Sequence, residues 1–491
     1  MQPFTTPGHA FRLPPSAFRR VALAAIAGLA SSCTSDAPTA ARANDFVVCH
    51  QAGSGALNLG IAAADLATHL GHGDYISLLH VNQSSDAGDA SRFRRITDAI
   101  AAARSARAAR QETVTSSCRI TISVAAGTYR GAFAAADDPA VERFPLLLDF
   151  PNVSLVGALA METDAAGRPT EADLGPSTIL APVRGMVNAP LPEVLVIVNG
   201  HPGGSFGHNV QIQGFSMRSG HVGVDSDTGG TGIMSVRVKD LVVRGNRFEP
   251  RLSSAIDLRA SSAIVDLNYA IGGTLCDFCL AGPGDYLVNY NRIAAGGIDG
   301  IVVTPLVVLP LPAGVETWTL PASASVTAQL VGNEIRDHLR KPVGVALRVA
   351  TLGQGGPNVP QSSQVEFRNN ILTNNTFAIM LEAGFPVANA LMKSDLDATL
   401  RGNVITRSCQ SDLLVAFTRH AAAIGVATRP YIRNSSFTLD LGADAGTKWS
   451  DAWFANPAGV GNELTVDGAI MPAGTRVAYD AARTCTPVFA N

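Results

Sequence analysis

The sequence has little charge and almost no lysine. Only 16% of its 491 residues are charged, the formal net charge is −3, and only four residues are lysine. A protein that binds nucleic acid neutralises phosphates with clustered lysine and arginine, whereas the arginines of this chain are scattered. The composition therefore argues against nucleic acid as a partner.

Aromatic residues are also scarce, at 6% of the chain, while glycine (47 residues) and proline (28 residues) are plentiful. This composition disfavours long charged helices and favours many short strands joined by turns. The chain is too long for an ordinary single core, so it consists of several domains or of one elongated repeat. Its hydrophobic fraction of 46% provides for an extensive core.

Near the N-terminus, three arginines precede an apolar run from Val21 to Ala30 that is too short to span a bilayer. This order is typical of an export signal. Residues 29–33 resemble a bacterial lipobox in which Cys33 would be lipidated; the alternative is cleavage after Ala43. We therefore expect a signal over 1–33, a linker over 34–47, and either an outer-membrane lipoprotein or a periplasmic or extracellular protein. Contact with a membrane is expected only through the lipid anchor.

Cysteine usage agrees with an oxidising compartment. Besides Cys33 there are six cysteines, namely Cys49, Cys118, Cys276, Cys279, Cys409 and Cys485. Up to three disulfides can form. The spacing of Cys276 and Cys279 favours a local disulfide over a metal half-site. Cys49 is expected to pair with Cys118 or to remain free.

After residue 90 the spacing of the apolar residues first follows a helix and then a strand. Phe93, Ile96, Ile100 and Ala103 follow helical spacing and predict one amphipathic helix over Ser91 to Ala109. From Ile120 to Arg130 apolar residues alternate at period two and then meet a Gly-Thr turn, which predicts a strand. Strands recur from there without long helices between them.

Many strands end at an asparagine that follows a turn residue. These asparagines are Asn246, Asn291, Asn333, Asn370, Asn403 and Asn434. Their separations shrink gradually along the chain, as in solenoid coils with loop insertions. Asparagine amides stacked on one another can hydrogen-bond along the solenoid, so we interpret these residues as scaffold.

The helix, the strand ITISVAAGTYRG, the segment FPNVSLVGA and the asparagine-marked coils together resemble the pectin lyase-like superfamily. The resemblance covers Ser91 to about Asp440 and implies an all-β, right-handed parallel β-helix with an N-terminal capping helix. Residues 441–491 would form a C-terminal cap or tail, tied by Cys485 to Cys409. The superfamily includes lyases, hydrolases, esterases, epimerases, adhesins and inert surface proteins, so the fold alone does not give the function.

Aligning the coils on an apolar pair predicts a row of outward side chains. The pairs are Val222/Val224, Ile256/Leu258, Ile301/Val303, Val345/Leu347, Ile379/Leu381 and Leu413/Val415. The outward residues of catalytic type are Asp225, Asp257, Arg259, Arg348 and Glu382.

Such a row would suit sugar chemistry. A uronate lyase needs a base, and cations such as arginine with Ca²⁺ held by carboxylates, to stabilise developing charge. A hydrolase needs two carboxylates instead, which Asp225 and Asp257 could supply. The alternative is structural, with ion pairs between neighbouring coils joining Asp225 to Arg259 and Arg348 to Glu382.

Three well-marked activities of the superfamily lack their motifs here. The pectinesterase resemblance at Gly127-Thr128-Tyr129 has Gly131 where those enzymes carry glutamate. The polygalacturonase and pectate lyase strings are absent as well. The sequence therefore disfavours these three activities.

Residues 48–80 form a Cys/His segment that resembles a short module of secreted bacterial proteins, C-H…H-L-x-H-G-D…C, without its closing cysteine. His50, His69, His72 and Asp74 are a reasonable ligand set for Zn²⁺. The alternative is a small hydrogen-bonded knot.

Together these observations predict an exported β-helix that binds a polysaccharide or cell-envelope glycan along an outer strand face. Cleavage of that glycan by lyase or hydrolase chemistry is the enzymatic form of the hypothesis. The alternative is a non-catalytic, adhesin-like surface solenoid.

Overall fold

The computed structural model describes residues 46–52, 55–84, 90–108, 118–132, 141–174, 177–182, 194–200, 209–218, 230–250, 252–305, 324–339, 344–351, 361–383, 393–416, 435–441, 452–455 and 461–471. The predicted signal, with Cys33, lies outside these residues. So do most of the linker, Asp225, Asn434 and Cys485. No helix in the described part of the chain is long and apolar enough to cross a membrane.

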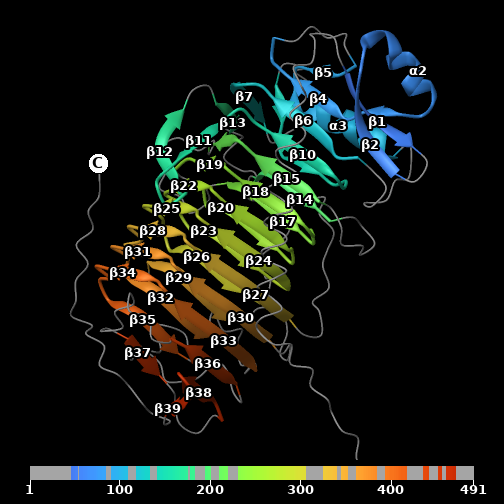
Figure 1. Cartoon of the computed structure of the whole chain (residues 1–491). Helices are drawn as coiled ribbons and strands as arrows, with labels where there is room; N and C mark the ends of the chain where they lie inside the picture. Colours follow the sequence, from blue (N-terminus) through green and yellow to red (C-terminus); the bar gives the residue numbers. More distant parts are fainter. Residues whose placement is uncertain are drawn as a thin grey trace, which may run out of the picture.

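Three long sheets run side by side along the molecule (Figure 1). Successive strands of the chain enter the three sheets in turn, and each pairs in parallel with the equivalent strands of the preceding and following coils. This is the topology of a parallel β-helix. The predicted fold class, a right-handed parallel β-helix with an N-terminal capping helix, is confirmed.

Sheet I contains β5 (Arg92–Phe93), β4 (Leu78–Val81), β6 (Ile120–Val124), β10 (Val153–Val156), β15 (Val210–Gln213), β18 (Leu241–Arg244), β21 (Ala263–Asp266), β24 (Gly284–Asn289), β27 (Ala324–Val331), β30 (Gln361–Arg368), β33 (Ser394–Arg401), β36 (Ser436–Asp440), β38 (Glu463–Val466) and β39 (Ala469–Met471). Sheet II contains β8 (Glu142–Arg143), β7 (Gly127–Ala132), β13 (Thr178–Pro182), β16 (Phe215–Met217), β19 (Arg247–Phe248), β22 (Tyr269–Ile271), β25 (Arg292–Ala294), β28 (Glu334–Arg336), β31 (Ile371–Thr373) and β34 (Val404–Thr406). Sheet III contains β9 (Leu146–Leu148), β14 (Val194–Asn199), β17 (Thr231–Val236), β20 (Ser254–Arg259), β23 (Cys276–Ala281), β26 (Asp299–Thr304), β29 (Val345–Thr351), β32 (Phe377–Ala383), β35 (Ser411–Ala416) and β37 (Ala452–Ala455).

Period-two alternation places one face of each strand in a continuous core. In sheet I, residues that are in register from coil to coil form an apolar column of Ile122, Leu155, Ile212, Val243, Val265 and Val288. All six side chains are buried in the same core cluster. Removing this surface from water stabilises the solenoid in proportion to the number of stacked coils.

A buried asparagine ladder lies at the corner between sheets I and II. Its members are Asn246, Asn268, Asn291, Asn333, Asn370 and Asn403, all with no exposed surface. In each step the side-chain Oδ1 of one asparagine accepts the backbone N–H and the Nδ2–H of the preceding asparagine, at 2.9 to 3.1 Å. The Nδ2 group also donates to a strand carbonyl of the preceding coil, as Asn370 does to Leu330 at 2.8 Å.

The ladder confirms the predicted role of the asparagine corners and adds one that the sequence pattern missed. Asn268 follows Leu267, which is not a turn residue, and the gap between Asn246 and Asn291 therefore concealed a complete coil. The residue before each ladder asparagine has positive φ, for example 60° at Gly245 and 56° at Leu267. Glycine adopts that conformation without strain and leucine only at a cost.

The N-terminal end of the core is covered by helix α3 (Ile96–Ala108), which packs on β4, β5, β6 and β9. Its first turn is anchored from sheet II, because the buried Glu142 carboxylate accepts the N–H groups of Ile96 and Thr97. Arg107, at the other end, is buried and donates to the hydroxyl of Tyr75 at 2.8 Å. The helix therefore has two of its N-terminal N–H groups satisfied and is held at both ends by buried side-chain contacts while it closes the core.

The Cys/His segment is partly continuous with the solenoid. It contains a small sheet of β1 (Phe46–Ala52), β2 (Gly55–Ile61) and β3 (Tyr75–Ile76), with the short helices η1 (Ala63–Asp65) and α2 (Leu66–Gly71). Its last strand, β4, already pairs with β6 in sheet I. Sheet I therefore begins before the predicted boundary at Ser91, and β38 extends it beyond Asp440 at the other end.

A hairpin of β11 (Ala160–Thr163) and β12 (Pro169–Leu174) projects from the coils at the sheet II side. Asp164 in its turn accepts a hydrogen bond from Arg292 of β25 at 2.9 Å. Arg292 also reaches Glu334 of the next coil at 2.8 Å. This ionic contact holds the hairpin against the solenoid.

The ladder makes a quantitative prediction for Asn370→Leu. The substitution removes one acceptor and two donors and leaves the backbone N–H and one Nδ2–H of Asn333 buried without their acceptor, at about 1–3 kcal/mol for each unsatisfied group. We expect the unfolding free energy to fall by about 3 kcal/mol or more, measured by thermal and urea denaturation. Val404→Thr, at an exposed strand position, is the matched control and should leave stability unchanged. Equal stability of the two variants would contradict a stabilising ladder.

Candidate functional site

Asp257 and Arg259 of β20 alternate with the core residues Ile256 and Leu258, so they lie on the outer side of sheet III. Both are nevertheless almost completely buried, at 4% and 2% exposure. Arg259 Nη2 donates to Asp257 Oδ2 at 2.6 Å, and Arg259 Nε lies 3.1 Å from both carboxylate oxygens. The opposite charges of Asp257 and Arg259 therefore compensate each other within one strand.

The predicted row was wrong in register at two coils. The strand that pairs with β20 is β17, whose Ile233 and Ser235 stack on Ile256 and Leu258. The Val222/Val224 alignment is therefore incorrect, because a serine at a core position interrupts the apolar pattern. Val236, and not Asp225, is the strand neighbour of Arg259.

The second error is a slip of two residues in β29. Leu347 and Val349, rather than Val345 and Leu347, pair with the core residues of β32. Arg348 is therefore in register with Met380, and Ala350 with Glu382. A strand with three alternating apolar residues allows such a slip, because shifting by two keeps every side chain on the same face.

Arg348 nevertheless contacts Glu382, as the structural alternative predicted, through its Nη2. Its Nη1 lies 3.1 Å from Asp299 Oδ2, so one guanidinium bridges two carboxylates. Burial disfavours the charge on Arg348, but the two carboxylates outweigh it and raise its pKa above the ordinary value. Burial also raises the pKa of Asp299, against the opposing effect of Arg348.

A buried histidine and aspartate extend this ionic cluster. His338 Nε2 lies 3.0 Å from Asp277 Oδ2, and both side chains are at most 1% exposed. Asp277 Oδ1 accepts the N–H of Gly273 at 3.0 Å. No local pattern in the sequence marks Asp277, Asp299 and His338, because they come from three different coils, on β23, on β26 and after β28. These residues form a buried cluster of ionisable groups in which Asp299 Oδ1 and His338 Nδ1 have no hydrogen-bond partner among the described residues.

Gly296 is required for the close approach of His338 and Asp277. A Cβ at this position would lie 2.0 Å from His338 Nε2 and 2.3 Å from Asp277 Oδ2. We expect Gly296→Ala to separate the two side chains and to lower the unfolding free energy by about 1–3 kcal/mol, measured by thermal denaturation. Gly60→Ala, whose Cβ would meet nothing within 4 Å, should have little effect. An unchanged melting temperature for Gly296→Ala would argue against tight packing here.

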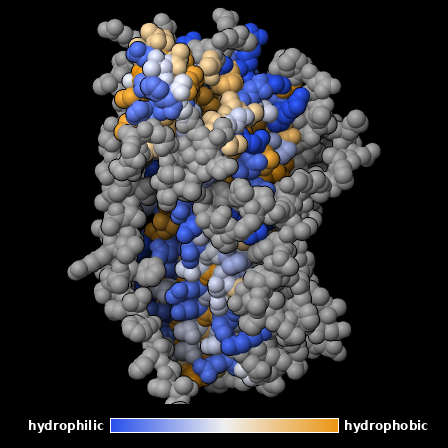
Figure 2. Space-filling model, turned by 90° about the vertical axis from the view of Figure 1, so that its right-hand side faces the viewer, coloured by the Kyte–Doolittle hydropathy of each residue, from blue (hydrophilic) through white to orange (hydrophobic). Residues whose placement is uncertain are grey.

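The outer side of sheet I differs because it is open. A groove of about 370 Å³ crosses β27, β30, β33 and β36. It is lined by Ser325, Val326, Thr327, Ser362, Ser363, Gln364, Asp395, Leu396, Asp397, Ser436 and Thr438. Figure 2 views the side that lies at the right of Figure 1 and shows many hydrophilic residues along the lower part of the molecule.

The groove residues are arranged in registered columns. Thr327, Gln364, Asp397 and Thr438 follow one another on successive strands. Ser325, Ser362 and Asp395 form the neighbouring column. Parallel strands are about 4.8 Å apart, so the groove presents hydroxyl, amide and carboxylate groups at a regular interval. Lys393 Nζ lies 3.0 Å from Asp395 and offsets part of the acidic charge.

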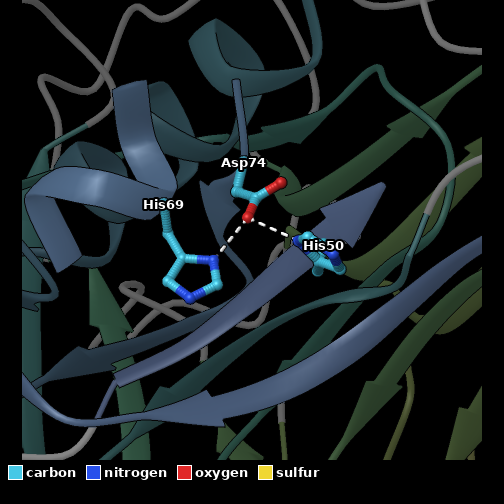
Figure 3. A group of neighbouring side chains, drawn as sticks. All are labelled: His50, His69 and Asp74. Atoms are coloured by element: carbon cyan, nitrogen blue, oxygen red, sulfur yellow. Dashed lines mark hydrogen bonds and ion pairs between the residues drawn. The ribbon is translucent and has the colours of Figure 1, made fainter. Parts of the chain in front are cut away.

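The N-terminal segment brings together three of the four predicted metal ligands (Figure 3). His50 comes from β1, His69 from α2, and Asp74 precedes β3. His50 Nδ1 and His69 Nδ1 lie 2.8 and 2.6 Å from the same oxygen, Asp74 Oδ2. His72 is exposed at the C-terminal end of α2 and is not part of this group.

The cysteine predictions are confirmed where the structure describes both partners. Cys49 is bonded to Cys118, and Cys276 to Cys279. Cys409 is also disulfide-bonded. The pairing of Cys409 with Cys485 stays a prediction.

The strand pairing defines a parallel β-helix protein, which carries an open polar groove on sheet I and a buried cluster of ionisable side chains on sheet III. No protein-family model matches this sequence, and no curated protein matches it.

Several solved structures show a low structural similarity to this chain. The DFA-IIIase from Arthrobacter chlorophenolicus A6 without its lid, in complex with GF2, has 12% identity over 80% of this chain and 99% of its own, with a TM-score of 0.38. ORF18 of Geobacillus virus E2 has 11% identity over 86% and 68%, with a TM-score of 0.38. The A-module of the mannuronan C-5 epimerase AlgE4 from Azotobacter vinelandii has 14% identity over 81% and 100%, with a TM-score of 0.31. At these TM-scores the likeness does not assign an activity to this chain.

Proposed function

We propose that this protein is exported and binds a polysaccharide chain in the sheet I groove. The observation that carries the proposal is the groove itself. It is lined mainly by serine, threonine, glutamine and aspartate on four successive parallel strands. A sugar polymer presents hydroxyl groups at regular intervals, and a regular array of donors and acceptors complements it. Hydrogen bonds fix the orientation of such ligands.

The charge of the groove supports a neutral polymer. Two aspartates line it, and its lining includes neither arginine nor lysine. A polyanion such as a uronate polymer would be repelled unless a cation bridged the two sets of carboxylates. Ca²⁺ suits that position because it prefers oxygen ligands. We therefore expect neutral polysaccharides to bind without metal and uronate polymers to require Ca²⁺.

The burial of the sheet III residues favours sheet I as the binding face. Arg259 and Arg348 are already paired with carboxylates of this chain, so their charges are compensated before any substrate arrives. A lyase needs such cations directed at the substrate. The catalytic role predicted for Asp225, Asp257, Arg259, Arg348 and Glu382 stays a prediction.

Two carboxylates in the groove bring hydrolysis within the proposal. Asp395 and Asp397 are two residues apart on β33, so both lie on the outer face with Cα atoms about 6.6 Å apart. Hydrolysis of a glycosidic bond uses two carboxyl groups separated by about 5 to 9.5 Å, a separation that side chains attached at this Cα spacing can adopt by rotation. Reducing ends released from the bound polymer would show hydrolysis, absorbing unsaturated ends would show a lyase, and binding with neither would favour the adhesin-like alternative.

Binding is tested with Gln364→Ala and Asp397→Ala against a panel of neutral and uronate polysaccharides. Each variant removes hydrogen-bonding capacity worth about 1 kcal/mol, so we expect the affinity measured by titration calorimetry to fall about fivefold. Thr406→Ala, an exposed threonine substitution on sheet II, is the matched control and should bind like the unaltered protein. Undiminished binding by both groove variants would rule out this face.

Export is tested separately through Cys33. If the lipobox prediction holds, a bacterial host will attach radiolabelled palmitate to the unaltered protein and none to Cys33→Ser. Export without lipid labelling of the unaltered protein, with an N-terminus after Ala43, would instead establish the second cleavage site. Retention of the full-length chain in the cytoplasm would contradict export.

A further inference from the structure

We propose that His50, His69 and Asp74 form a binding site for Zn²⁺. The three side chains each offer one ligand atom, and these atoms lie within 4.8 Å of one another. They come from three separate elements, so their meeting is a product of the fold and not of a local sequence repeat. This site is independent of the polysaccharide groove.

The orientation of the two imidazoles is that of a converging ligand set. Both Nδ1 atoms point at Asp74 Oδ2, and the ring centroids lie 5.6 Å apart with planes at 80° (Figure 3). A tetrahedral zinc ion at about 2.0–2.1 Å from each ligand separates the ligand atoms by about 3.3 Å. The separations of 2.8 and 2.6 Å from Asp74 Oδ2 must open by about 0.5 to 0.7 Å to reach this value, and the two imidazole ligand atoms, within 4.8 Å of each other, must come to the same separation.

The backbone around the site is held in place from several directions. β1 pairs with β3 so that Cys49 faces Tyr75, which sets His50 beside Asp74. The disulfide from Cys49 to Cys118 fastens β1 to the start of the solenoid. The N–H of Asp74 donates to the carbonyl of His69 at 3.1 Å and closes the turn after α2. Such a constrained frame reduces the conformational entropy lost when a metal binds.

The chemistry of the donors selects the class of metal. Two imidazole nitrogens and one carboxylate oxygen suit zinc, whereas Ca²⁺ and Mg²⁺ prefer oxygen ligands alone. The Asp74 side chain is 2% exposed, while those of His50 and His69 are 33% and 20% exposed. A carboxylate at that depth is stabilised by a cation. The partly exposed imidazole side leaves a fourth coordination position for water or for a group of a partner.

His72 provides a matched control on the same helix end. It lies three residues after His69 and was predicted as a fourth ligand, yet it is exposed and outside the cluster. If zinc bound only adventitiously to surface histidines, the exposed His72 would contribute to binding as much as His50 or His69. Comparing the three histidine substitutions therefore distinguishes a built site from surface binding.

The experiment uses the mature protein after treatment with a chelator, titrated with Zn²⁺ in a calorimeter and checked by elemental analysis after gel filtration. We expect one equivalent of zinc. His50→Ala and His69→Ala should weaken binding by more than about tenfold, whereas His72→Ala should retain it. Circular dichroism verifies that each variant is folded.

Titration of the unaltered protein with Co²⁺ gives a readout that needs no variant. Strong visible absorption, displaced by one equivalent of Zn²⁺, is expected for a tetrahedral site with nitrogen ligands. The proposal is overturned if the folded protein takes up no stoichiometric zinc, if cobalt gives only the weak spectrum of an octahedral ion, or if His72→Ala loses as much affinity as the other two variants. In those cases the three side chains form a hydrogen-bonded knot.

Discussion

The asparagine ladder is the interaction on which the rest of the solenoid depends. Its amides are buried without any exposed surface and satisfy one another from coil to coil. A coil that slipped by one residue would leave these groups without partners in the core and would turn the apolar face of its strands outward. The ladder therefore keeps the strands of each sheet in register, and the register decides which side chains become neighbours on the outside.

That register produces two different outer faces. On sheet III, acidic and basic side chains meet within and between coils and close into the Asp257–Arg259 pair and the Asp299–Arg348–Glu382 network. Apolar side chains such as Met380 and Leu414 are also buried there, in a second small cluster. On sheet I, short polar side chains that cannot cover the strands leave a groove. The contrast is one of burial, since the outward residues of β20 and β35 on sheet III are buried whereas those of β30 and β33 on sheet I are partly or fully exposed.

The N-terminal segment is joined to this solenoid by covalent and non-covalent contacts. β4 pairs in sheet I, Cys49 is bonded to Cys118, and buried Arg107 of the capping helix reaches Tyr75. The segment that carries the histidines is thus part of the end of the solenoid. The positions of the three proposed zinc ligands are therefore fixed by the same contacts that hold this segment on the solenoid.

Local patterns in the sequence were sufficient to predict the fold class, the capping helix, most ladder corners and the Cys276–Cys279 disulfide, because alternation, helical spacing and turn residues each act over a few residues; the sequence left Cys49 to pair with Cys118 or to remain free. Coil register was not determined, since Ser235 occupies a core position and Leu267 a positive-φ corner that patterns assign to other residues. Only the tertiary structure decided that Arg348 and Glu382 pair in a buried network with Asp299, that His72 is excluded from the histidine cluster, and that the open face is sheet I. These outcomes depend on contacts between residues tens of positions apart. The lengths of the segments between these residues decide which of them meet, and no local preference does so.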